Sequence, residues 1–255
     1  RVKTITITGT NGKWSTAATI RSIFEAAGYK VDLFTSPHVQ SYTERFVFES
    51  KEISEKNLYN LLSEVGSKNS SKPITVFELL TSAFFFYSAL KSNSDLIIAE
   101  NGLFQRYDSV SSIGHHLMKV VCQIGLDHLD WLPENKRSID QIIIEKTSNI
   151  MSSNIIVSKQ NNTEILKKIQ QNIEKNNAKK IIFAKDYSYE INKDGFLYED
   201  KFGLLQLPKP NLLGDHQIAN TACAISAVRN LKQYKITNEN IVKGIKSIKN
   251  MRGRL

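Results

Sequence analysis

The stretch TITITGTNGKWST, residues 4–16, decides the fold of this chain. It starts as an apolar strand, passes through a loop with two glycines and a lysine, and continues into a helical pattern. A strand that leads through a glycine loop directly into a helix can surround a phosphate with backbone N–H groups, at the positive end of the helix dipole. The stretch therefore predicts a phosphate-binding loop between a strand and a helix.

The side chains of this loop suit a nucleotide and its metal ion. Lys13 supplies a fixed positive charge, and the hydroxyl of Ser15 or Thr16 is a ligand for Mg²⁺. The spacing differs from the commoner GxxxxGK[ST] motif, because only two residues separate the glycines and Trp14 follows the lysine. Taken alone, a turn followed by a good helix start explains the stretch about as well.

The rest of the chain continues this strand and helix alternation, which is typical of a parallel sheet flanked by helices. A helix over 15–28 with apolar side chains at helical spacing ends at Gly28, a residue favoured after helix ends. Short apolar runs between turn residues indicate buried central strands. We expect further helices over 54–67, 75–91, 137–150, 163–178, 214–231 and 238–249, and strands over 4–8, 30–35, 95–100, 119–125, 154–158 and 180–184.

Residues 187–207 follow a different pattern. Their residues alternate, are rich in aromatics and surround the turn sequence NKDG, which indicates a hairpin. We therefore predict an α/β fold with a mostly parallel sheet and a phosphate-binding loop, plus a small antiparallel β appendage near residues 187–207. One domain is expected over residues 1–255.

The composition favours a globular protein without a membrane segment. The longest apolar stretch, residues 76–90, contains a glutamate and is shorter than the roughly 20 residues of a spanning helix. Two cysteines and the lack of a signal-peptide pattern indicate a reduced, cytoplasmic setting. The net charge of +9 comes from scattered lysines without interleaved aromatic residues, a pattern that disfavours nucleic-acid binding. It is typical of solvated helix faces, and a weaker interpretation is that the positive field attracts an anionic substrate.

At this point the sequence resembles the Mur ligase superfamily and, within it, the folylpolyglutamate synthase/dihydrofolate synthase family. Family members carry GTNGKG followed by Ser or Thr, and GTNGKWST matches except at Trp14. The match continues through later blocks in the same order: AAGYKVDLFTSPHVQSYTERF, TVFELLT, AENGLFQRYDS, IGLDH, IIEKTSNI, LLGDHQIANTACAI and the final GRL. The resemblance implies the central ATP-binding domain of such an enzyme.

The resemblance also implies the nucleotide and metal residues. Lys13, His128 and Lys146 would be catalytic, with Lys146 carbamylated by CO₂ so that it accompanies the metal ions as an anion. Two Mg²⁺ ions would be held by Ser15, Ser36, Glu100 and His128. ATP would be bound by Gly9, Thr10, Asn11, Gly12, Lys13, Ser15 and Thr16, with Asn220 at the adenine and Arg254 at the phosphates.

Taken one at a time, several of these residues also fit structural roles. Ser36 could prepare a turn before proline, Lys146 could be a surface charge, and Asn220 a helix-surface amide. Glu100 has independent support, because it ends an apolar strand, and α/β proteins bind ligands at the carboxyl edge of a parallel sheet.

For the acceptor substrate, the resemblance points to a pterin. It would lie against Thr75, Phe77, Tyr107, Asp108 and Ser109, although Phe77 could equally be part of the core. The implied reaction forms an amide: ATP phosphorylates a carboxylate of folate or dihydropteroate, and the amino group of L-glutamate attacks the acyl phosphate. We expect a monomer with these small-molecule partners and no nucleic acid or membrane partner.

Departures from the family pattern leave alternatives open. Where members read EVGLGGRLDATN this chain reads ENGLFQRYDSVS, so that Phe104 and Gln105 replace glycines, and Trp14 replaces a glycine next to the triphosphate. The family's lead segment and C-terminal domain are also outside these 255 residues. The alternatives are a fragment of a longer chain, a decayed and non-catalytic remnant that binds nucleotide weakly, or another superfamily ligase acting on a UDP-muramoyl peptide.

Overall fold

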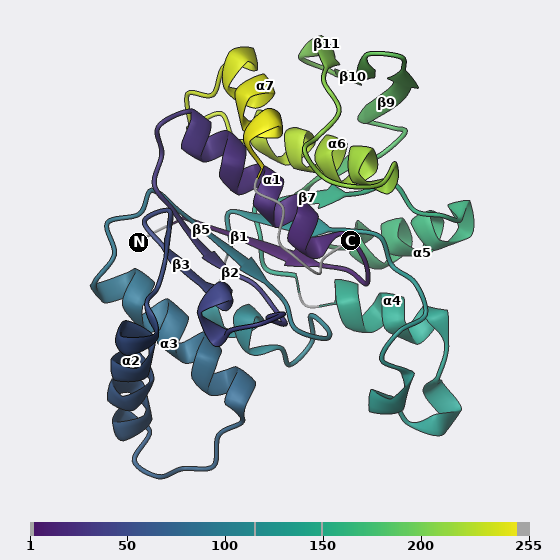
Figure 1. The fold of residues 1–255 in the computed structure, drawn as a ribbon. Coiled ribbons are helices and arrows are strands. Elements are labelled where there is room, and N and C mark those ends of the chain that lie inside the picture. The colour runs from purple at the N-terminus through teal and green to yellow at the C-terminus, as the bar shows by residue number, and fades with distance from the viewer. Residues whose placement is uncertain (1–2, 115, 149, 249–255) are drawn as a thin grey trace.

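A single eight-stranded sheet organises the chain (Figure 1), and the computed structural model describes residues 3–114, 116–148 and 150–248. The strand order is β4-β3-β2-β5-β1-β6-β7-β8. The six strands from β2 to β8 run parallel, whereas β3 and β4 pair antiparallel at one edge. Their bounds are β1 Lys3–Thr8, β2 Val31–Phe34, β3 Phe46–Phe48, β4 Lys51–Glu52, β5 Leu96–Glu100, β6 Met118–Val121, β7 Asn154–Val157 and β8 Lys179–Ile182.

Helices cover both faces of the sheet (Figure 1). On one face α1 packs against α6 and α7 over the centre of the sheet. On the other face, α2 and α3 form one core with β2 and β5, and α4 and α5 form another with β6, β7 and β8. The helices are α1 Lys13–Ala26, α2 Glu55–Lys68, α3 Val76–Leu90, α4 Ile139–Thr147, α5 Thr163–Glu174, α6 His216–Arg229 and α7 Asn238–Ser247.

The predicted α/β class and the appendage are confirmed. Residues 187–207 form a separate antiparallel sheet of three strands, β9 Tyr187–Asn192, β10 Gly195–Asp200 and β11 Gly203–Leu207, which lies beside α6 (Figure 1). Each predicted helix and strand is present, with shifts at the ends: α1 begins at Lys13 rather than at residue 15, and α4 is shorter than residues 137–150. Among the described residues, no helix is long and apolar enough to cross a membrane.

The segment after β2 is the main element that the sequence patterns missed. The sequence predicts a loop over residues 36–45, yet Tyr42–Arg45 form a 3₁₀ turn and β3 and β4 follow as a short antiparallel extension of the sheet. Two strands of three and two residues are too short to show an alternating pattern of their own. β3 pairs with β2 and β4 with β3, and the turn before β3 is held by Glu44, which accepts three backbone N–H groups.

Candidate functional site

The loop between β1 and α1 presents an uncapped helix start. Gly12 precedes α1 with a left-handed φ of 81°, no side chain caps the first turn, and no acidic residue lies in that turn. The backbone N–H groups of a first turn have no partner within the helix and attract anions. Because no described protein group serves as the cap, the start of α1 suits an anionic ligand.

The segment after β6 holds this loop in place. The backbone N–H groups of Thr10 and Asn11 both donate to the Gln123 carbonyl, at 2.8 and 3.1 Å. The Thr10 hydroxyl lies 3.1 Å from both the backbone N and the carbonyl O of Gly125. Thr10, predicted to bind ATP, therefore also holds the loop in place. Gln123 and Gly125 support the loop, and the sequence motif did not reveal them.

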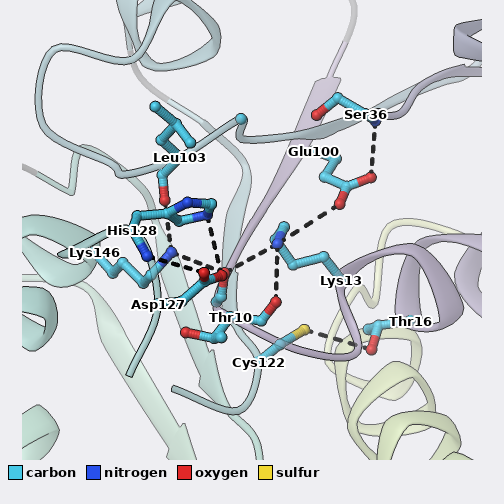
Figure 2. Close-up of polar contacts among 12 residues, drawn as sticks. Thr10, Lys13, Thr16, Ser36, Glu100, Leu103, Cys122, Asp127, His128 and Lys146 are labelled. Carbon is cyan, nitrogen blue, oxygen red and sulfur yellow. Dashed lines mark hydrogen bonds and ion pairs between the residues drawn. The ribbon is translucent and has the colours of Figure 1, made fainter. Parts of the chain in front are cut away.

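Lys13 lies at the centre of the site (Figure 2). Its Nζ donates to the carbonyls of Gly9 and Thr10, at 3.1 and 3.2 Å, and lies 3.9 Å from Glu100 Oε1. These contacts hold the ammonium group above the loop, next to the start of α1. A lysine held there is placed to meet the phosphates of a nucleotide.

Glu100 and Ser36 come together on one side of Lys13 (Figure 2). Glu100 ends β5, is 2% exposed, and its Oε2 accepts the backbone N–H of Ser36 at 3.1 Å. β5, which ends at Glu100, pairs with β1, and β2, which Ser36 follows, pairs with β5, so the two residues meet at the same edge of the parallel sheet. The buried carboxylate is a hard oxygen ligand of the kind that Mg²⁺ prefers.

His128 and Lys146 lie on the other side of Lys13 (Figure 2). The His128 Nε2 lies 3.1 Å from Asp127 Oδ2, and His128 has a left-handed φ of 54°, a strained conformation often found at functional sites. Burial lowers the pKa of His128, and the Asp127 charge counteracts this in part. Asp127 was not predicted, although it precedes the histidine in the IGLDH block.

Lys146 is fully buried and tied to the phosphate-binding loop. Its Nζ donates to the carbonyls of Gly9, at 3.1 Å, and Leu103, at 2.6 Å, and lies 5.5 Å from the centre of the Phe104 ring. Burial and the charge of Lys13 lower the pKa of Lys146 to about 7. Phe104 stands where the family pattern has a glycine, and its ring packs over the Lys146 amine.

The two hydroxyls of the loop have different surroundings. Thr16 is fully buried, and its Oγ1 accepts a hydrogen bond from the Cys122 thiol at 3.5 Å. Ser15 instead lines a cavity of about 440 Å³ together with Gly12. Of the two hydroxyls left open by the sequence, Ser15 is the one that faces space for a ligand.

That cavity also contains the predicted adenine residue. Asn220 of α6 is among its lining residues, with His216 and Gln217 beside it. The Asn220 Nδ2 donates to Gln217 Oε1 at 3.0 Å. Lys159 and Tyr189 also line this cavity. Sequence reasoning missed them, because the appendage brings Tyr189 to the site only in the folded chain. Arg254 lies outside the described residues.

Trp14 lies on the wall of a different cavity. This cavity, of about 450 Å³, is also lined by Ala18 of α1, Thr35 after β2 and Val47 of β3. Trp14 is absent from the described lining of the cavity that holds Ser15 and Asn220. The indole that the sequence placed next to the triphosphate thus points toward the β2–β4 side of the helix.

We therefore expect the Trp14→Gly variant to bind Mg·ATP with a Kd within twofold of the original chain, measured by titration calorimetry. The same variant should unfold more easily, because glycine in a helix costs about 1 kcal/mol and part of the buried indole surface is lost. Distinctly tighter nucleotide binding by the glycine variant would instead show that Trp14 crowds the ligand.

A third cavity, of about 540 Å³, lies beside the predicted acceptor residues. Tyr107, Asp108 and Ser109 line it, whereas Thr75 and Phe77 are absent from its described lining. Thr75 caps α3, where its hydroxyl donates to Glu78. Phe77 packs against Gly102, where an added Cβ would lie 2.9 Å from the ring.

The loop residues on this cavity have different exposure. Tyr107 is 89% exposed, whereas both Asp108 oxygens accept backbone N–H groups, from Gly102 at 2.8 Å and Val110 at 2.9 Å. Ser109 donates to the Thr81 hydroxyl at 3.0 Å. The structure thus holds the Asp108 carboxylate firmly and leaves the Tyr107 ring on the surface.

Lys119, in the middle of β6, is a buried charge that sequence reasoning missed. The side chain is fully buried, and burial lowers its pKa from the ordinary value of 10.5 to about 7, with the Asp108 charge opposing the shift. Its Nζ donates to the Asn101 side-chain oxygen. The apolar run KVVCQIG predicts a central strand, and nothing in that pattern indicates that its lysine is buried.

The Lys119 shift predicts a pH dependence of stability. Between pH 7 and 10.5 the unfolded chain binds the lysine proton and the folded chain does not, so the free energy of unfolding rises with pH. In Lys119→Met this rise should be smaller. Urea unfolding at pH 7 and pH 9.5 measures how much the free energy of unfolding rises in each protein. An equal rise in the original chain and in Lys119→Met would contradict the prediction.

The oxygen donors at this site fit a metal ion that is held partly by protein and partly by a bound nucleotide. In the described ranges, no three His, Cys, Asp or Glu side chains gather as a metal site would require. Mg²⁺, however, commonly uses one or two protein oxygens together with water and nucleotide phosphates. Glu100, whose carboxylate accepts the backbone N–H of Ser36, suits that kind of coordination better than a metal cage made by protein alone.

The family match agrees with this geometry. The family described as Mur ligase middle domain matches residues 7–228, most of the chain, and the chain belongs to this family. Within it, the curated dihydrofolate synthase/folylpolyglutamate synthase of Bacillus subtilis (strain 168) is 29% identical over 252 residues. That alignment covers 93% of this chain and 57% of the relative, so this chain spans just over half of that protein's length.

Solved structures show the same fold. E. coli FolC in complex with DHPP and ADP matches with a TM-score of 0.83 and 30% identity, covering 99% of this chain and 58% of the other. A bifunctional folylpolyglutamate synthase/dihydrofolate synthase with Mn, AMPPNP and L-glutamate bound matches at 26% identity, covering 99% of this chain and 59% of the other. The resemblance inferred from the motif blocks is confirmed.

Proposed function

We propose that this chain is the nucleotide-binding part of an ATP-dependent ligase that joins L-glutamate to a folate or to dihydropteroate. The observation that carries the proposal is the uncapped, glycine-bounded start of α1, with Lys13 held over it and Glu100 at the same sheet edge. The similarity to proteins with DHPP, nucleotide and L-glutamate bound supports the choice of substrates.

The nucleotide would lie along the start of α1. Its phosphates would meet the first-turn N–H groups and the Lys13 ammonium, and its base would enter the cavity lined by Asn220 and Gln217. A charge fixed at the phosphates stabilises the negative charge that spreads over them during transfer. We assign Lys13 this role, and no protein nucleophile is required, because the acceptor's own carboxylate takes the phosphoryl group.

The residues that would hold magnesium are Glu100, Ser36 and Ser15 for one ion and His128 for a second. When bound, such ions neutralise phosphate charge and polarise the transferring group. The bound Mn of a similar structure supports a divalent metal. Asp127 beside His128 would orient the imidazole, as carboxylates commonly do for metal-binding histidines.

Carbamylation of Lys146 is part of the same proposal. An amine must be neutral to attack CO₂, which forms an N–C bond, releases a proton and leaves a carbamate anion. A pKa of about 7 leaves much of the Lys146 amine neutral near pH 7. The amine would give up the hydrogen bond to the Leu103 or the Gly9 carbonyl.

The acceptor would occupy the cavity lined by Asp108 and Ser109. A carboxylate held by two backbone N–H groups is fixed in place to accept hydrogen bonds from a flat heterocycle. We further propose that the whole protein acts as a monomer in the cytoplasm on these small molecules, without nucleic-acid or membrane partners.

The test measures ADP release with Mg·ATP, L-glutamate and a panel of acceptors: dihydropteroate, tetrahydrofolate and a UDP-muramoyl peptide. Acceptor-dependent ADP release with dihydropteroate or tetrahydrofolate supports the proposal, and turnover of the UDP-muramoyl peptide alone would reject it. Calorimetry with Mg·ATP runs in parallel. Nucleotide binding without any ligation by this chain is the result expected of a non-catalytic remnant.

A further inference from the structure

The most unusual charge in the described core is Lys119. It lies in β6 directly beside Thr6 of the central strand β1, and its side chain is fully buried. Burying a lysine costs free energy unless a polar partner compensates for it. Within the described ranges no carboxylate forms an ion pair with this ammonium, so its position must be explained by the polar groups that it contacts.

Those groups belong to the loop of residues 101–111, which follows β5. The Lys119 Nζ donates to Oδ1 of Asn101, and Nδ2 of Asn101 donates to Oγ of Ser111 at 3.0 Å. The Asn101 backbone N–H is bound to the Ile7 carbonyl of β1 at 2.9 Å. Asn101 therefore joins both ends of the loop to the sheet, and Lys119 fixes the orientation of its amide.

Asp108 lies within this loop and lines the acceptor cavity. Burial raises the pKa of its carboxyl, and the Val110 N–H, the Asn101 amide and the Lys119 charge counteract the rise. Of the other charged groups, Lys146 of α4 also interacts with Asp108, and Glu78 of α3 is turned back onto Thr75. Lys119 is the positive charge that contributes most to lowering the pKa of the Asp108 carboxyl.

We propose that Lys119 is a positioning residue for the acceptor: through Asn101 it holds the 101–111 loop, and with it the Asp108 carboxylate, in the arrangement that lines the acceptor cavity. This inference rests on the proposed function, because it assumes that the cavity takes the pteridine acceptor. Lys119 touches neither the acceptor cavity nor the nucleotide cavity, since it is absent from the described lining of both.

Two variants separate positioning from a merely structural role. Lys119→Met removes the charge and leaves the buried Asn101 oxygen without its donor, which should lower the unfolding midpoint. Lys119→Met combined with Asn101→Val removes both polar partners, which should restore much of that stability. Thermal unfolding measures the two changes.

The binding experiment uses titration calorimetry of dihydropteroate, and separately tetrahydrofolate, into the chain with Mg·ADP present. We expect at least tenfold weaker acceptor binding in Lys119→Met and no recovery in the double variant, while the Kd for Mg·ADP stays within twofold. In the double variant the acceptor affinity should also begin to fall at a higher pH than in the original chain, because Asp108 loses its nearby positive charge and takes up a proton earlier.

Each outcome is decisive. If the double variant binds the acceptor with the original affinity and pH profile, Lys119 is only structural and the inference is overturned. If the original chain binds Mg·ADP but neither acceptor, the proposed function fails, and the assignment of Lys119 fails with it. If the original chain binds the acceptor and both variants lose acceptor affinity but keep their affinity for Mg·ADP, the result supports the proposed function and the positioning role of Lys119.

Discussion

Lys13→Met should bind Mg·ATP about 100-fold more weakly than the original chain. The substitution keeps most of the length of the side chain and removes the ammonium that donates to the Gly9 and Thr10 carbonyls and lies 3.9 Å from Glu100. Hydrogen bonds to charged groups are worth about 1.5–3 kcal/mol, and the upper end of that range corresponds to the expected loss. Titration calorimetry with Mg·ATP measures the change.

Lys56→Met is the matched control for that experiment. Lys56 is exposed on α2, far along the chain from the phosphate-binding loop, so this variant makes the same change in net charge on the surface. Its affinity should be unchanged at moderate ionic strength, where distant exposed charges are largely screened. Equal affinities of Lys13→Met and the original chain would mean that the triphosphate does not lie on the loop before α1.

Gly12→Ala should weaken Mg·ATP binding at least tenfold. Gly12 has a left-handed φ of 81°, and an added Cβ would lie 2.2 Å from the Asn220 oxygen. Asn220 can avoid this contact only by rotating away from the cavity and giving up its hydrogen bond to Gln217. The substitution therefore disturbs both the phosphate end and the base end of the nucleotide site.

Gly28→Ala provides the control, because it carries the backbone strain without the contact. Gly28 also has a left-handed φ, of 87°, but an added Cβ would meet no atom within 4 Å. A left-handed alanine costs roughly 1–2 kcal/mol, so both variants should lose that much stability in chemical denaturation. Only Gly12→Ala should lose nucleotide affinity, and a similar loss in both would show that global strain, not the local contact, is responsible.

Much of the fold could be predicted from local patterns. The apolar runs at β1, β5, β6 and β7 are long enough to be read as buried strands, and the helices between them have apolar residues at helical spacing. Because the carboxyl ends of parallel strands share one edge, Glu100 and the loop after β1 could be placed together in advance. The structure confirms that juxtaposition through the contact between Lys13 and Glu100.

Other features depend on contacts between distant segments, which no local pattern contains. Whether Ser15 or Thr16 faces the ligand follows from the position of Cys122, 106 residues away from Thr16. The direction of Trp14 follows from space left by the β2–β4 segment. The predicted roles of the individual site residues, including Arg254 beyond the described part of the chain, stay predictions.

By itself, the sequence determined the phosphate-binding loop, the parallel α/β architecture and the family, because these depend on short-range order along the chain: strand, glycine turn, helix. Only the tertiary structure decided that Trp14 lines a different cavity from Ser15 and Asn220, and that Lys119 is bound to Asn101 at the start of the Asp108 loop. The reason is physical: the burial of a side chain and the identity of its neighbours are set by packing between elements far apart in the chain, and burial in turn sets the charge state of groups such as Lys119.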